Sequence, residues 1–535
     1  MKSVIVEEIR ELIQKALDTL GLETSGFVVE HPADLKMGDY STNAAIKYGH
    51  GEEILSYLNE NRPEGVKKIM LAGPGFINFY LSKEFFKKSL GEIIDKGDEF
   101  GKNQKLKRKK IFIEHTQPNP FKEFHIGHLM NNAIGEAIAR IVSANGALVK
   151  TASYHGDVGL HVAKAVWAIK HDHDLKYAYA VGAKAYEEDD EVKKEIQDIN
   201  KKIYEHSDEE INKIYDMGKK ASMESFYKLY RTIGATFDYC FFESEAGALG
   251  KQIVMENLGK TFEESEGAIV FKGEKFGLHT RVFLNREKLP TYEAKEIALA
   301  LIKKNIFPYD KSITITGNEQ DAFFNVVEKA SESLYPELEG KLKHLSHGML
   351  RLPSGKMSSR AGKVITAEEL IESVKEKVKG DEMVAIGAIK YMILRQSIGN
   401  DIVFDVEKSV STEGDSGVYL QYAYARANSL LEKANIQGRT LDINSQGQTL
   451  RDTHEIEKIL YRFPEVIERA GQEYAPHYIT TYLTELAGSF NNFYAHEQVI
   501  DDSLESPYRL AIVKAFNIVM KNGLSILGIP SPEKM

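Results

Sequence analysis

IFIEHTQPNPFKEFHIGHLMNNAIGEAIARI, residues 111–141, changes its pattern twice within one stretch of chain. It begins with a short apolar run at residues 111–113, which is typical of a strand. Pro118 and Pro120 follow, and proline disfavours a helical conformation in the residue before it. From about His125, apolar side chains recur at helical spacing: Leu129, Ala133, Ile134, Ala137, Ile138 and Ile141. The stretch therefore predicts a strand, a loop and a helix, in that order.

The predicted helix opens with the sequence HIGH, residues 125–128, which suits the binding of phosphate. The first turn of a helix has free backbone N–H groups and the positive end of the helix dipole. His125 and His128 are three residues apart, so both rings can lie on one face, and Gly127 lets a flat ring approach the backbone. Two imidazoles placed there can donate hydrogen bonds to phosphate oxygens whose charge grows in a transition state. The alternative is a helix N-terminus with two ordinary surface histidines.

A second signature, GKMSSR at residues 355–360, lies about 230 residues after the HIGH sequence. The pair resembles the HIGH and KMSKS motifs of class I aminoacyl-tRNA synthetases, and the surrounding residues are most similar to arginyl-tRNA synthetases. The resemblance extends from GDYSTN at residues 38–43 to LGIPSPEKM at residues 527–535. It implies an α/β Rossmann-like parallel-sheet catalytic domain of the HIGH/KMSKS type. It also implies a small N-terminal α/β domain and a C-terminal all-α helical bundle.

Three domains are expected on this basis. Residues 1–105 would form the N-terminal α/β tRNA-contacting domain, and residues 106–400 the class I catalytic domain. Residues 401–535 would form the α-helical anticodon-binding domain. A helical insertion in the catalytic domain is expected at about 171–290, because this part begins with a long charged segment of helical pattern that carries no catalytic motif.

Apolar periodicity places the other elements coarsely. It predicts helices over about residues 4–20, 456–472, 477–495 and 508–527, and a second strand at residues 313–317. The chain contains neither GxGxxG nor GxxxxGK[ST], so the dinucleotide-binding and P-loop interpretations lose support.

The composition is that of a soluble globular protein, with 42% hydrophobic and 28% charged residues among 535. A chain of this length is expected to form two to four domains. No apolar run reaches the ~20 residues of a membrane span, and the N-terminal sequence alternates charge unlike a signal peptide. The single cysteine, Cys240, permits no internal disulfide, so a cytoplasmic protein without membrane contact is expected. The net charge of −10 is weak evidence against a nucleic-acid partner, since phosphate binding needs only local positive surface.

The resemblance implies ATP with Mg²⁺ as a substrate, and it gives the triphosphate to His125, His128 and Lys356. The family loop often has a second lysine where this chain has Ser359, and Lys122, just before the HIGH sequence, is expected to stand in for it. The residues expected to border ATP are Gly127, His347, Gly348, Met349, Lys356, Met357 and Ser358.

The amino-acid end of the site needs groups that match a guanidinium, which presents a fixed fork of five donors and is always charged. Tyr292 and Glu296 are four residues apart and share one face of a helix, and the family has a tyrosine and an acid there, more often aspartate. By resemblance, Glu114 and Asn119 hold the α-amino group and backbone of the substrate. The whole set expected to bind arginine is Glu114, Asn119, His125, Tyr292, Glu296 and Gln320.

HGDVGLH at residues 155–161 has a composition that metal sites use, but a structural or substrate-lining role is favoured because no cysteine accompanies it. No tightly bound metal is expected. The lysine-rich stretch at residues 102–110 is interpreted as a solvated connector, with a phosphate-contacting patch as the alternative.

Four residues are expected to contact tRNA, by resemblance. Phe76 and Asn78 would contact the D-loop, one by stacking and one by hydrogen bonding. Tyr419 and Arg426, seven apart on one helical face, would contact the anticodon. For most other aromatic side chains in these domains the core is the better assignment.

The leading hypothesis is an arginine–tRNA ligase that acts on L-arginine, ATP and tRNA(Arg), as a monomer like most of the family. One alternative is a nucleotidyltransferase that uses HxGH for another acid, or a synthetase for another amino acid. A second is a non-catalytic tRNA-binding paralogue. Tyr292 and Glu296 argue against the first alternative, and intact His125, His128 and Lys356 argue against the second. Met130 is a departure, because the family commonly has arginine after HIGHL.

Overall fold

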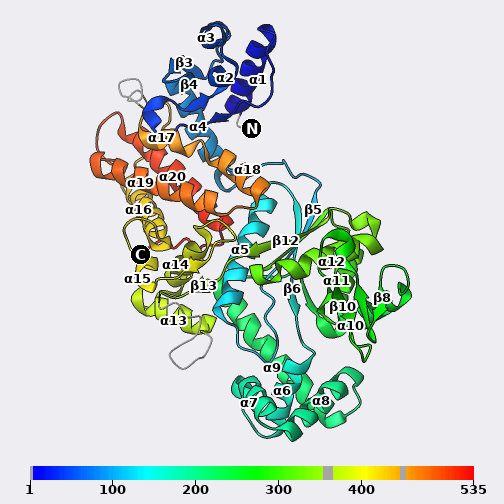
Figure 1. Ribbon diagram of the computed structural model, residues 1–535. Coiled ribbons are helices and arrows are strands. Elements are labelled where there is room, and N and C mark those ends of the chain that lie inside the picture. Colours follow the sequence, from blue (N-terminus) through cyan, green and yellow to red (C-terminus); the bar gives the residue numbers. More distant parts are fainter. Residues whose placement is uncertain (1–3, 354–364, 446–452) are drawn as a thin grey trace.

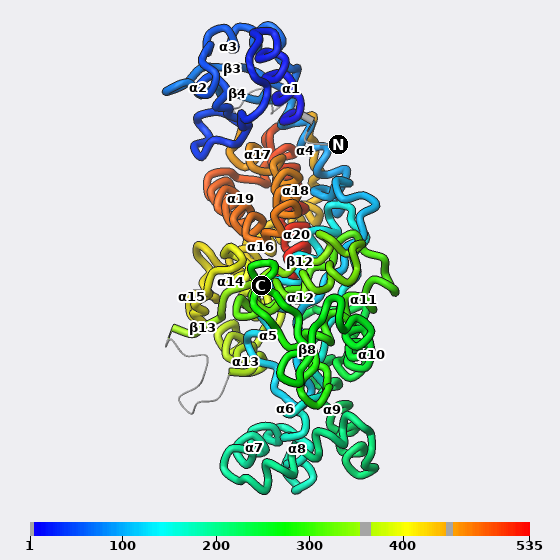
Figure 2. The backbone as a smooth tube through the Cα atoms, turned by 45° about the vertical axis from the view of Figure 1, so that its right-hand side comes forward, coloured from blue at the N-terminus to red at the C-terminus, as the bar shows by residue number. Residues whose placement is uncertain are grey.

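The computed structural model describes residues 4–353, 365–445 and 453–535. The chain forms an elongated molecule with an N-terminal domain at one end and a group of helices at the other (Figure 1). The view in Figure 2 shows the same order, with the C-terminal helices and the catalytic region between those two ends.

The N-terminal domain is a four-stranded antiparallel sheet covered by helices, in strand order β1-β2-β4-β3. The predicted first helix is confirmed as α1, which buries Ile5, Ile9, Ile13 and Ala16 along one stripe. The elements of this domain are α1 (Val4–Thr19), β1 (Val29–Glu30), β2 (Tyr40–Thr42), α2 (Ala44–Tyr48), α3 (Gly51–Glu60), β3 (Val66–Ala72), β4 (Phe76–Leu81) and α4 (Lys83–Lys96).

The catalytic region is organised around a five-stranded parallel sheet in the order β12-β11-β5-β6-β7. Both predicted strands are confirmed as members of it. Neighbouring parallel strands need a crossover, and helix α5 supplies the one between β5 and β6. The strands are β5 (Lys110–Glu114), β6 (Leu148–His155), β7 (Tyr239–Phe242), β11 (Lys311–Gly317) and β12 (Leu342–His347), and the helix is α5 (Ile126–Ala144).

The sheet is buried on both faces, as a parallel sheet requires. Ile111 and Ile113 of β5 pack in one apolar cluster with α5, and Phe112 packs on the opposite face with helices α10 and α11. These helices are α10 (Glu243–Glu256) and α11 (Tyr292–Ile306), with α12 (Asp321–Leu334) beside them. The Rossmann-like arrangement expected from the sequence is therefore confirmed.

The helical insertion is shorter than the sequence predicts. Its helices are α6 (Leu160–Lys170), α7 (Leu175–Glu188), α8 (Asp190–Glu205) and α9 (Glu209–Ile233). Gly234, at φ +66°, ends α9, and the chain then returns to the central sheet as β7. Residues 263–284 form a small antiparallel sheet of β8 (Glu263–Ser265), β9 (Ala268–Phe271) and β10 (Arg281–Leu284). The prediction of helix up to residue 290 is wrong because β7 belongs to the central sheet through β6, a partner about 87 residues earlier that a local pattern does not show, and because residues 263–284 form local hairpins.

The C-terminal part is helical, as predicted, and is built around α20, which is buried along most of its length. Three of its helices fall at predicted places: α18, α19 and α20. Its helices are α15 (Val406–Ser409), α16 (Gly417–Ile436), α17 (Glu455–Leu460), α18 (Phe463–Glu473), α19 (His477–His496) and α20 (Ser506–Ile526). Two helices before residue 401 pack against them, α13 (Ala367–Lys377) and α14 (Glu382–Leu394). A two-stranded pair, β13 (Leu350–Arg351) and β14 (Ile402–Val403), links this part to the catalytic sheet. No helix among the described residues has the length and apolar character needed to cross a membrane.

Helix α5 is fixed against the C-terminal helices at its far end. Arg140 of α5 donates hydrogen bonds to the carbonyl oxygens of Ser525 and Gly234, at 3.2 Å each. Lys390 of α14 donates to the carbonyl oxygen of Gly528 at 2.8 Å. Arg140 and Lys390 therefore both bind the negative C-terminal end of α20. The Arg140 contact connects α5, the helix that begins with the HIGH sequence, to α20.

Candidate active site

A cavity of about 620 Å³ opens where the central strands end and α5 begins. Its walls come from the loop after β5, the first turns of α5 and α11, and the segments after β11 and β12. The predicted site residues that line it are Asn119, His125, Gly127, His128, Tyr292, Glu296, Gln320, His347, Gly348 and Met349. Residues that the sequence separates by more than 200 positions thus meet in one cavity.

His125 and His128 cap the helix they begin. The Nδ1 of His125 accepts the N–H of Gly127 at 3.1 Å, and the Nδ1 of His128 accepts the N–H of His125 at 3.2 Å. The expectation of free backbone N–H groups is therefore wrong for Gly127, whose donor is satisfied by the ring. Because both Nδ1 atoms accept, each neutral ring carries its proton on Nε2. The rings stack with centroids 3.6 Å apart, so two Nε2–H donors stand side by side.

Both histidines are neutral at pH 7. Burial lowers the pKa of His125, and burial together with the nearby His125 lowers the pKa of His128 well below its usual value. The charge of Lys122 adds to both shifts. At neutral pH these rings are therefore dipolar hydrogen-bond donors and not fixed positive charges.

Lys122 does not line the cavity. Its Nζ lies 4.6 Å from the ring centroid of Tyr179 in the insertion helix α7. Burial, then the charge of Lys164, lowers the pKa of Lys122. The face of the Tyr179 ring stabilises the positive charge of Lys122.

The KMSKS-like loop, with Lys356, Met357, Ser358 and Ser359, lies outside the described residues. The residues directly after this loop, Ile365 and Thr366, bond to the HIGH sequence. The N–H of Ile126 donates to the carbonyl oxygen of Ile365 at 3.1 Å, and Thr366 forms a bridge with His125.

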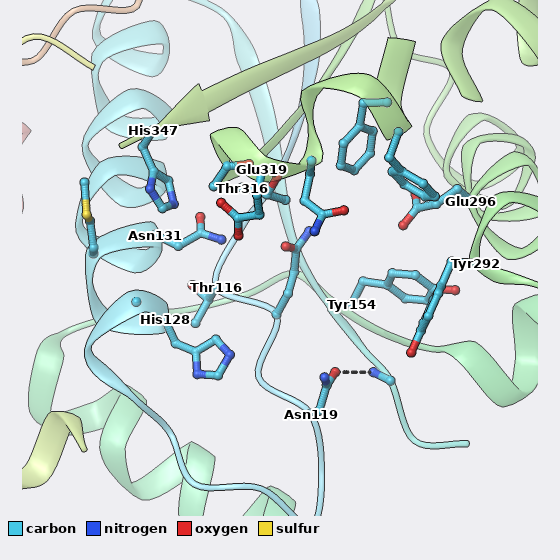
Figure 3. A pocket seen from close by; sticks show the side chains of 18 of the residues that line it. Thr116, Asn119, His128, Asn131, Tyr154, Tyr292, Glu296, Thr316, Glu319 and His347 are labelled. Carbon is cyan, nitrogen blue, oxygen red and sulfur yellow. Dashed lines mark hydrogen bonds between the residues drawn. The ribbon is translucent and has the colours of Figure 1, made fainter. Parts of the chain in front are cut away.

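Tyr292 and Glu296 lie at the other end of the cavity from His128 and His347 (Figure 3). Both belong to α11, which begins at Tyr292. Burial, then the charge of Glu114, raises the pKa of Glu296 well above its usual value. A buried carboxyl group with this shift gains most when a cation arrives beside it.

Glu114 is not a wall of the cavity. It is fully buried, with an exposed fraction of 0%. One carboxylate oxygen accepts from Lys303 of α11 at 2.9 Å, and the other accepts from the amide of Gln117 at 2.6 Å. Glu114 is thus held by an internal ammonium and an internal amide, and its assignment to the substrate stays a prediction.

The structure adds an acid that the sequence analysis missed. Glu243 lines the cavity, and its carboxylate accepts from Lys295 of α11 at 2.6 Å. Glu243 follows β7 directly, and acids at the ends of strands are a known signal in open α/β sheets. The signal was missed because β7 was assigned to a helical insertion.

Hydrogen bonds and close packing fix Asn119 and the His347–Met349 segment at the edge of the cavity. The Oδ1 of Asn119 accepts the N–H of Gly156 at 3.0 Å (Figure 3), which leaves its NH₂ for a ligand. A Cβ on Gly348 would lie 2.4 Å from the backbone of Asn400, so only glycine fits there. The N–H of Met349 donates to Asp401 at 2.8 Å, so this part of the segment's backbone is already engaged.

Comparison with known proteins identifies the parts of the chain. Residues 7–81 match the arginyl tRNA synthetase N terminal domain, residues 90–406 the catalytic domain of class I tRNA synthetases (R), and residues 420–535 the DALR anticodon binding domain. An arginine–tRNA ligase of Halothermothrix orenii is 30% identical over 99% of both chains, and one of Borrelia hermsii is 30% identical over 100% of both.

The chain belongs to the arginyl-tRNA synthetase family.

Solved structures agree on the fold. An arginyl-tRNA synthetase from Thermus thermophilus superposes with a TM-score of 0.79 at 24% identity, over 99% of this chain and 100% of that one. One from Plasmodium falciparum gives a TM-score of 0.80 at 20% identity, over 99% of each chain. The arrangement of domains in arginyl-tRNA synthetases is therefore present here along the whole chain.

The polar side chains of the HGDVGLH segment form hydrogen bonds to other groups of the protein. Asp157 is fully buried and accepts hydrogen bonds from Tyr215 at 2.9 Å, from Lys219 at 2.6 Å and from Ser244 at 2.7 Å. His155 and His161 bond backbone oxygens of Pro118 and Gly156. These contacts hold the loops beside the cavity, and among the described residues no cluster of three metal-ligating side chains occurs.

The residues that the family resemblance gives to tRNA lie far from this cavity. Phe76 is 37% exposed, whereas Asn78 is buried and accepts from Ser41 at 2.7 Å. Arg426 lies over the rings of Tyr422 and Tyr494, at 4.6 and 5.0 Å from their centroids. Tyr419 is half-buried about two turns before Arg426 on the same helix.

Proposed function

We propose that this chain is an arginine–tRNA ligase that activates L-arginine with Mg–ATP and transfers it to the 3′ end of tRNA(Arg). The observation that carries the proposal is the meeting of Glu296 and Tyr292 with His125 and His128 in one cavity. Curated relatives that match over 99–100% of both chains carry the name arginine–tRNA ligase.

In the first step, a carboxylate oxygen of arginine attacks the α-phosphorus of ATP, and the bond to the bridging oxygen breaks as pyrophosphate leaves. Both reacting groups belong to substrates, so the protein supplies position and charge stabilisation. The two Nε2–H groups of His125 and His128 donate to phosphate oxygens as their negative charge grows. Lys356 and Lys122 are assigned to the pyrophosphate side.

The guanidinium is assigned to the Tyr292–Glu296 end. Glu296 gives a buried carboxylate that pairs with the planar fork, and Tyr292 and Gln320 add polar contacts. The NH₂ of Asn119, which the Gly156 contact leaves unused, is assigned to the substrate carboxylate. A site built to pair such a fork rejects an analogue without it by about 10⁴-fold or more.

In the second step, a ribose hydroxyl at the 3′ end of tRNA attacks the carbonyl carbon of the adenylate, and AMP leaves. Phe76 is assigned to stacking on the outer part of tRNA, with Asn78 holding the strand behind it. Tyr419 and Arg426 are assigned to the anticodon, where the Arg426–Tyr422–Tyr494 group offers stacking faces. A monomeric, cytoplasmic enzyme completes the proposal.

One assay tests the function. The full chain is incubated with Mg–ATP, total tRNA and each of the twenty amino acids in turn, and aminoacyl-tRNA is counted. Charging with arginine alone is expected. Charging with another amino acid would favour a different synthetase, and tRNA binding without any charging would favour a non-catalytic paralogue.

A further inference from the structure

A tyrosine of the C-terminal helices packs inside the core of the N-terminal domain. Tyr461 lies in the turn between α17 and α18, yet it is 7% exposed and belongs to the apolar cluster of that domain. Its ring centroid lies 5.2 Å from that of Phe85 and 5.9 Å from that of Phe86, edge-on to both. The ring of Tyr40, on β2, lies 6.1 Å away and completes this aromatic socket. The two parts of the chain therefore share one core here.

Glu465 of α18 adds polar contacts beside this tyrosine. One carboxylate oxygen accepts from the hydroxyl of Tyr40 at 2.6 Å, and the other lies 3.2 Å from Nε2 of His31. The second ring nitrogen of His31, Nδ1, bonds the carbonyl oxygen of Asp39 at 2.7 Å. These bonds fix both the distance and the direction between α18 and the start of β2. We call the contacts of Tyr461 and Glu465 with the N-terminal domain the joint.

Opposite charges face each other across the joint. Asp39 is 2% exposed, and burial raises the pKa of its carboxyl group. A hydrogen bond from the N–H of Leu81, at 2.7 Å, opposes this rise, and so do the positive charges of Lys458 and Arg462. Because Lys458 and Arg462 belong to α17 and the turn after it, Coulomb attraction favours one placement of the domain against these helices.

The end of α4 is a second place where the N-terminal domain is held. Asn522 of α20 donates to the carbonyl oxygens of Gly97 and Phe100, at 2.9 and 3.0 Å. Gly97 directly follows α4, whereas Phe85 and Phe86 of the socket lie in its first turn. At about 1.5 Å per residue, these two ends of α4 are roughly 20 Å apart. The joint therefore sets the direction of the domain about a distant anchor.

Strand β4 connects the joint to Phe76. Tyr40 of β2 pairs with Phe79 of β4, which is three residues from Phe76 on the same strand. At about 3.3 Å per residue, Phe76 lies roughly 10 Å beyond this pair. Phe76 is 37% exposed, and the domain that carries it lies at one end of the elongated molecule (Figure 1). A rotation at the joint would therefore displace this ring and leave the catalytic cavity as it is.

We propose that the joint positions Phe76 for its contact with tRNA, so that Glu465 is a positioning residue for tRNA binding. A contact surface that is fixed before binding costs less entropy when the ligand arrives. Without the joint, the domain spends only part of its time in the competent direction, and the apparent affinity for tRNA falls by that fraction. The inference rests on the proposed function, because Phe76 is assigned to tRNA there.

A double-mutant cycle tests the inference. The KM for tRNA(Arg) is measured in charging assays for Glu465→Ala, Phe76→Ala and the double variant. Glu465→Ala is expected to raise this KM about five- to tenfold. Phe76→Ala is expected to raise it about tenfold, as the loss of one base stack does. The double variant should stay within about twofold of Phe76→Ala, because the joint acts through that ring. The KM values for arginine and ATP, and kcat at saturating tRNA, should change less than about twofold.

Two further variants separate position from charge and stability. Glu468→Ala is the matched control, since Glu468 lies on the same helix and pairs with Lys105, in the segment that leads to β5, at 2.8 Å. It should leave every value unchanged. Glu465→Gln keeps an oxygen for Tyr40 and offers an amide donor to His31, so its KM for tRNA(Arg) should lie within about threefold of the original. Should Glu465→Ala fold poorly, Tyr461→Leu takes its place in the cycle.

Several results would overturn the inference. These are an unchanged KM for tRNA(Arg) in Glu465→Ala, an equal rise in Glu468→Ala, no recovery in Glu465→Gln, a parallel rise in the KM for arginine, and a double variant that multiplies the two single effects. Failure of the unmodified chain to charge arginine would instead overturn the proposed function. The same cycle is then read as dissociation constants for total tRNA from filter binding, and absence of binding would overturn both.

Discussion

His125 is at once the N-cap of α5 and a wall of the cavity, so one imidazole uses its two nitrogens for two purposes. Nδ1 satisfies the helix and Nε2 faces outward. The backbone thereby sets the tautomer, and the donor needed for phosphate is available without protonation. The lowered pKa values of both histidines fit this role, since a neutral ring keeps Nε2–H across the whole neutral range.

Replacing His125 with asparagine separates these two purposes. Asparagine is a good N-cap, so the helix should keep its stability to within about 1 kcal/mol. The phosphate donor is lost, and arginine-dependent ATP–pyrophosphate exchange with tRNA present should fall about 10²- to 10³-fold. A thermal unfolding midpoint close to that of the unmodified chain serves as the control. An exchange rate within threefold of the original would exclude His125 from the chemistry.

Lys122 tests whether a lysine outside the loop serves the triphosphate. Lys122→Met keeps an apolar stem against the ring of Tyr179 and removes the charge. Exchange is expected to slow about 10- to 100-fold, as when a hydrogen bond from a charged group is lost. Lys193→Met is the matched control, because Lys193 also lies over a tyrosine of the insertion, Tyr186, and does not border the cavity. Equal rates for both variants would end the assignment of Lys122.

At the scale of elements, the arginine end depends on how closely α10 and α11 cross. A Cβ built on Gly250 of α10 would lie 2.3 Å from the carbonyl oxygen of Ala294 in α11. Tyr292 and Glu296 flank Ala294, and Glu243 begins α10. The glycine thus sets the distance between the two helices that carry the acids of the site.

Gly250→Ala should push the two helices apart and raise the KM for arginine about 10- to 100-fold, because small displacements of a binding group are costly. Gly247→Ala, on the same helix, is the control: its Cβ would find Pro290 Cγ at 3.5 Å, an ordinary contact. That variant should keep the original KM and gain up to about 1 kcal/mol of helix stability. A Gly250→Ala enzyme with unchanged KM would show that the crossing does not control the site.

At the scale of the molecule, the domains are joined through buried and half-buried polar groups. Glu465 of α18 accepts from Tyr40 at 2.6 Å and contacts His31 Nε2 at 3.2 Å, which links the N-terminal domain to the C-terminal helices. Arg140 and Lys390 link those helices to α5. The HIGH helix is therefore connected, through packed elements, to both regions assigned to tRNA.

Three buried histidines make the whole fold sensitive to acid. Burial lowers the pKa of His115, His155 and His161 to about 4 each, against about 6.5 in an unfolded chain. Between these values the unfolded state binds more protons, so stability is present above pH 6.5 and is lost as the pH falls toward 4. These three groups alone give a slope of roughly 4 kcal/mol per pH unit near pH 5, and His125 and His128, whose pKa values burial also lowers, add to it.

The thermal unfolding midpoint should therefore fall steeply between pH 6.5 and pH 4.5 and change little between pH 6.5 and pH 8. His161→Gln, which keeps a donor for the carbonyl oxygen of Gly156, should make the acid loss of stability shallower by at most about 1.4 kcal/mol per pH unit, the share of one group. A midpoint that is flat down to pH 4.5, or a His161→Gln profile identical to the original, would contradict this account.

Local patterns in the sequence predicted the strand–loop–helix unit and the helical C-terminal part, and the family resemblance indicated the two ends of the site. Period and spacing are local properties: HIGH begins a helix, and Tyr292 and Glu296 share a face, whatever surrounds them. Only the tertiary structure decided what the buried acids do. Glu114 is withdrawn from the cavity by Lys303, Glu243 enters it beside Lys295, and β7 joins the sheet instead of an insertion helix. Each of these outcomes depends on a partner between 50 and 190 residues away in the sequence. In a buried environment of low dielectric constant, such a partner determines the charge of an acidic side chain and the direction in which it points.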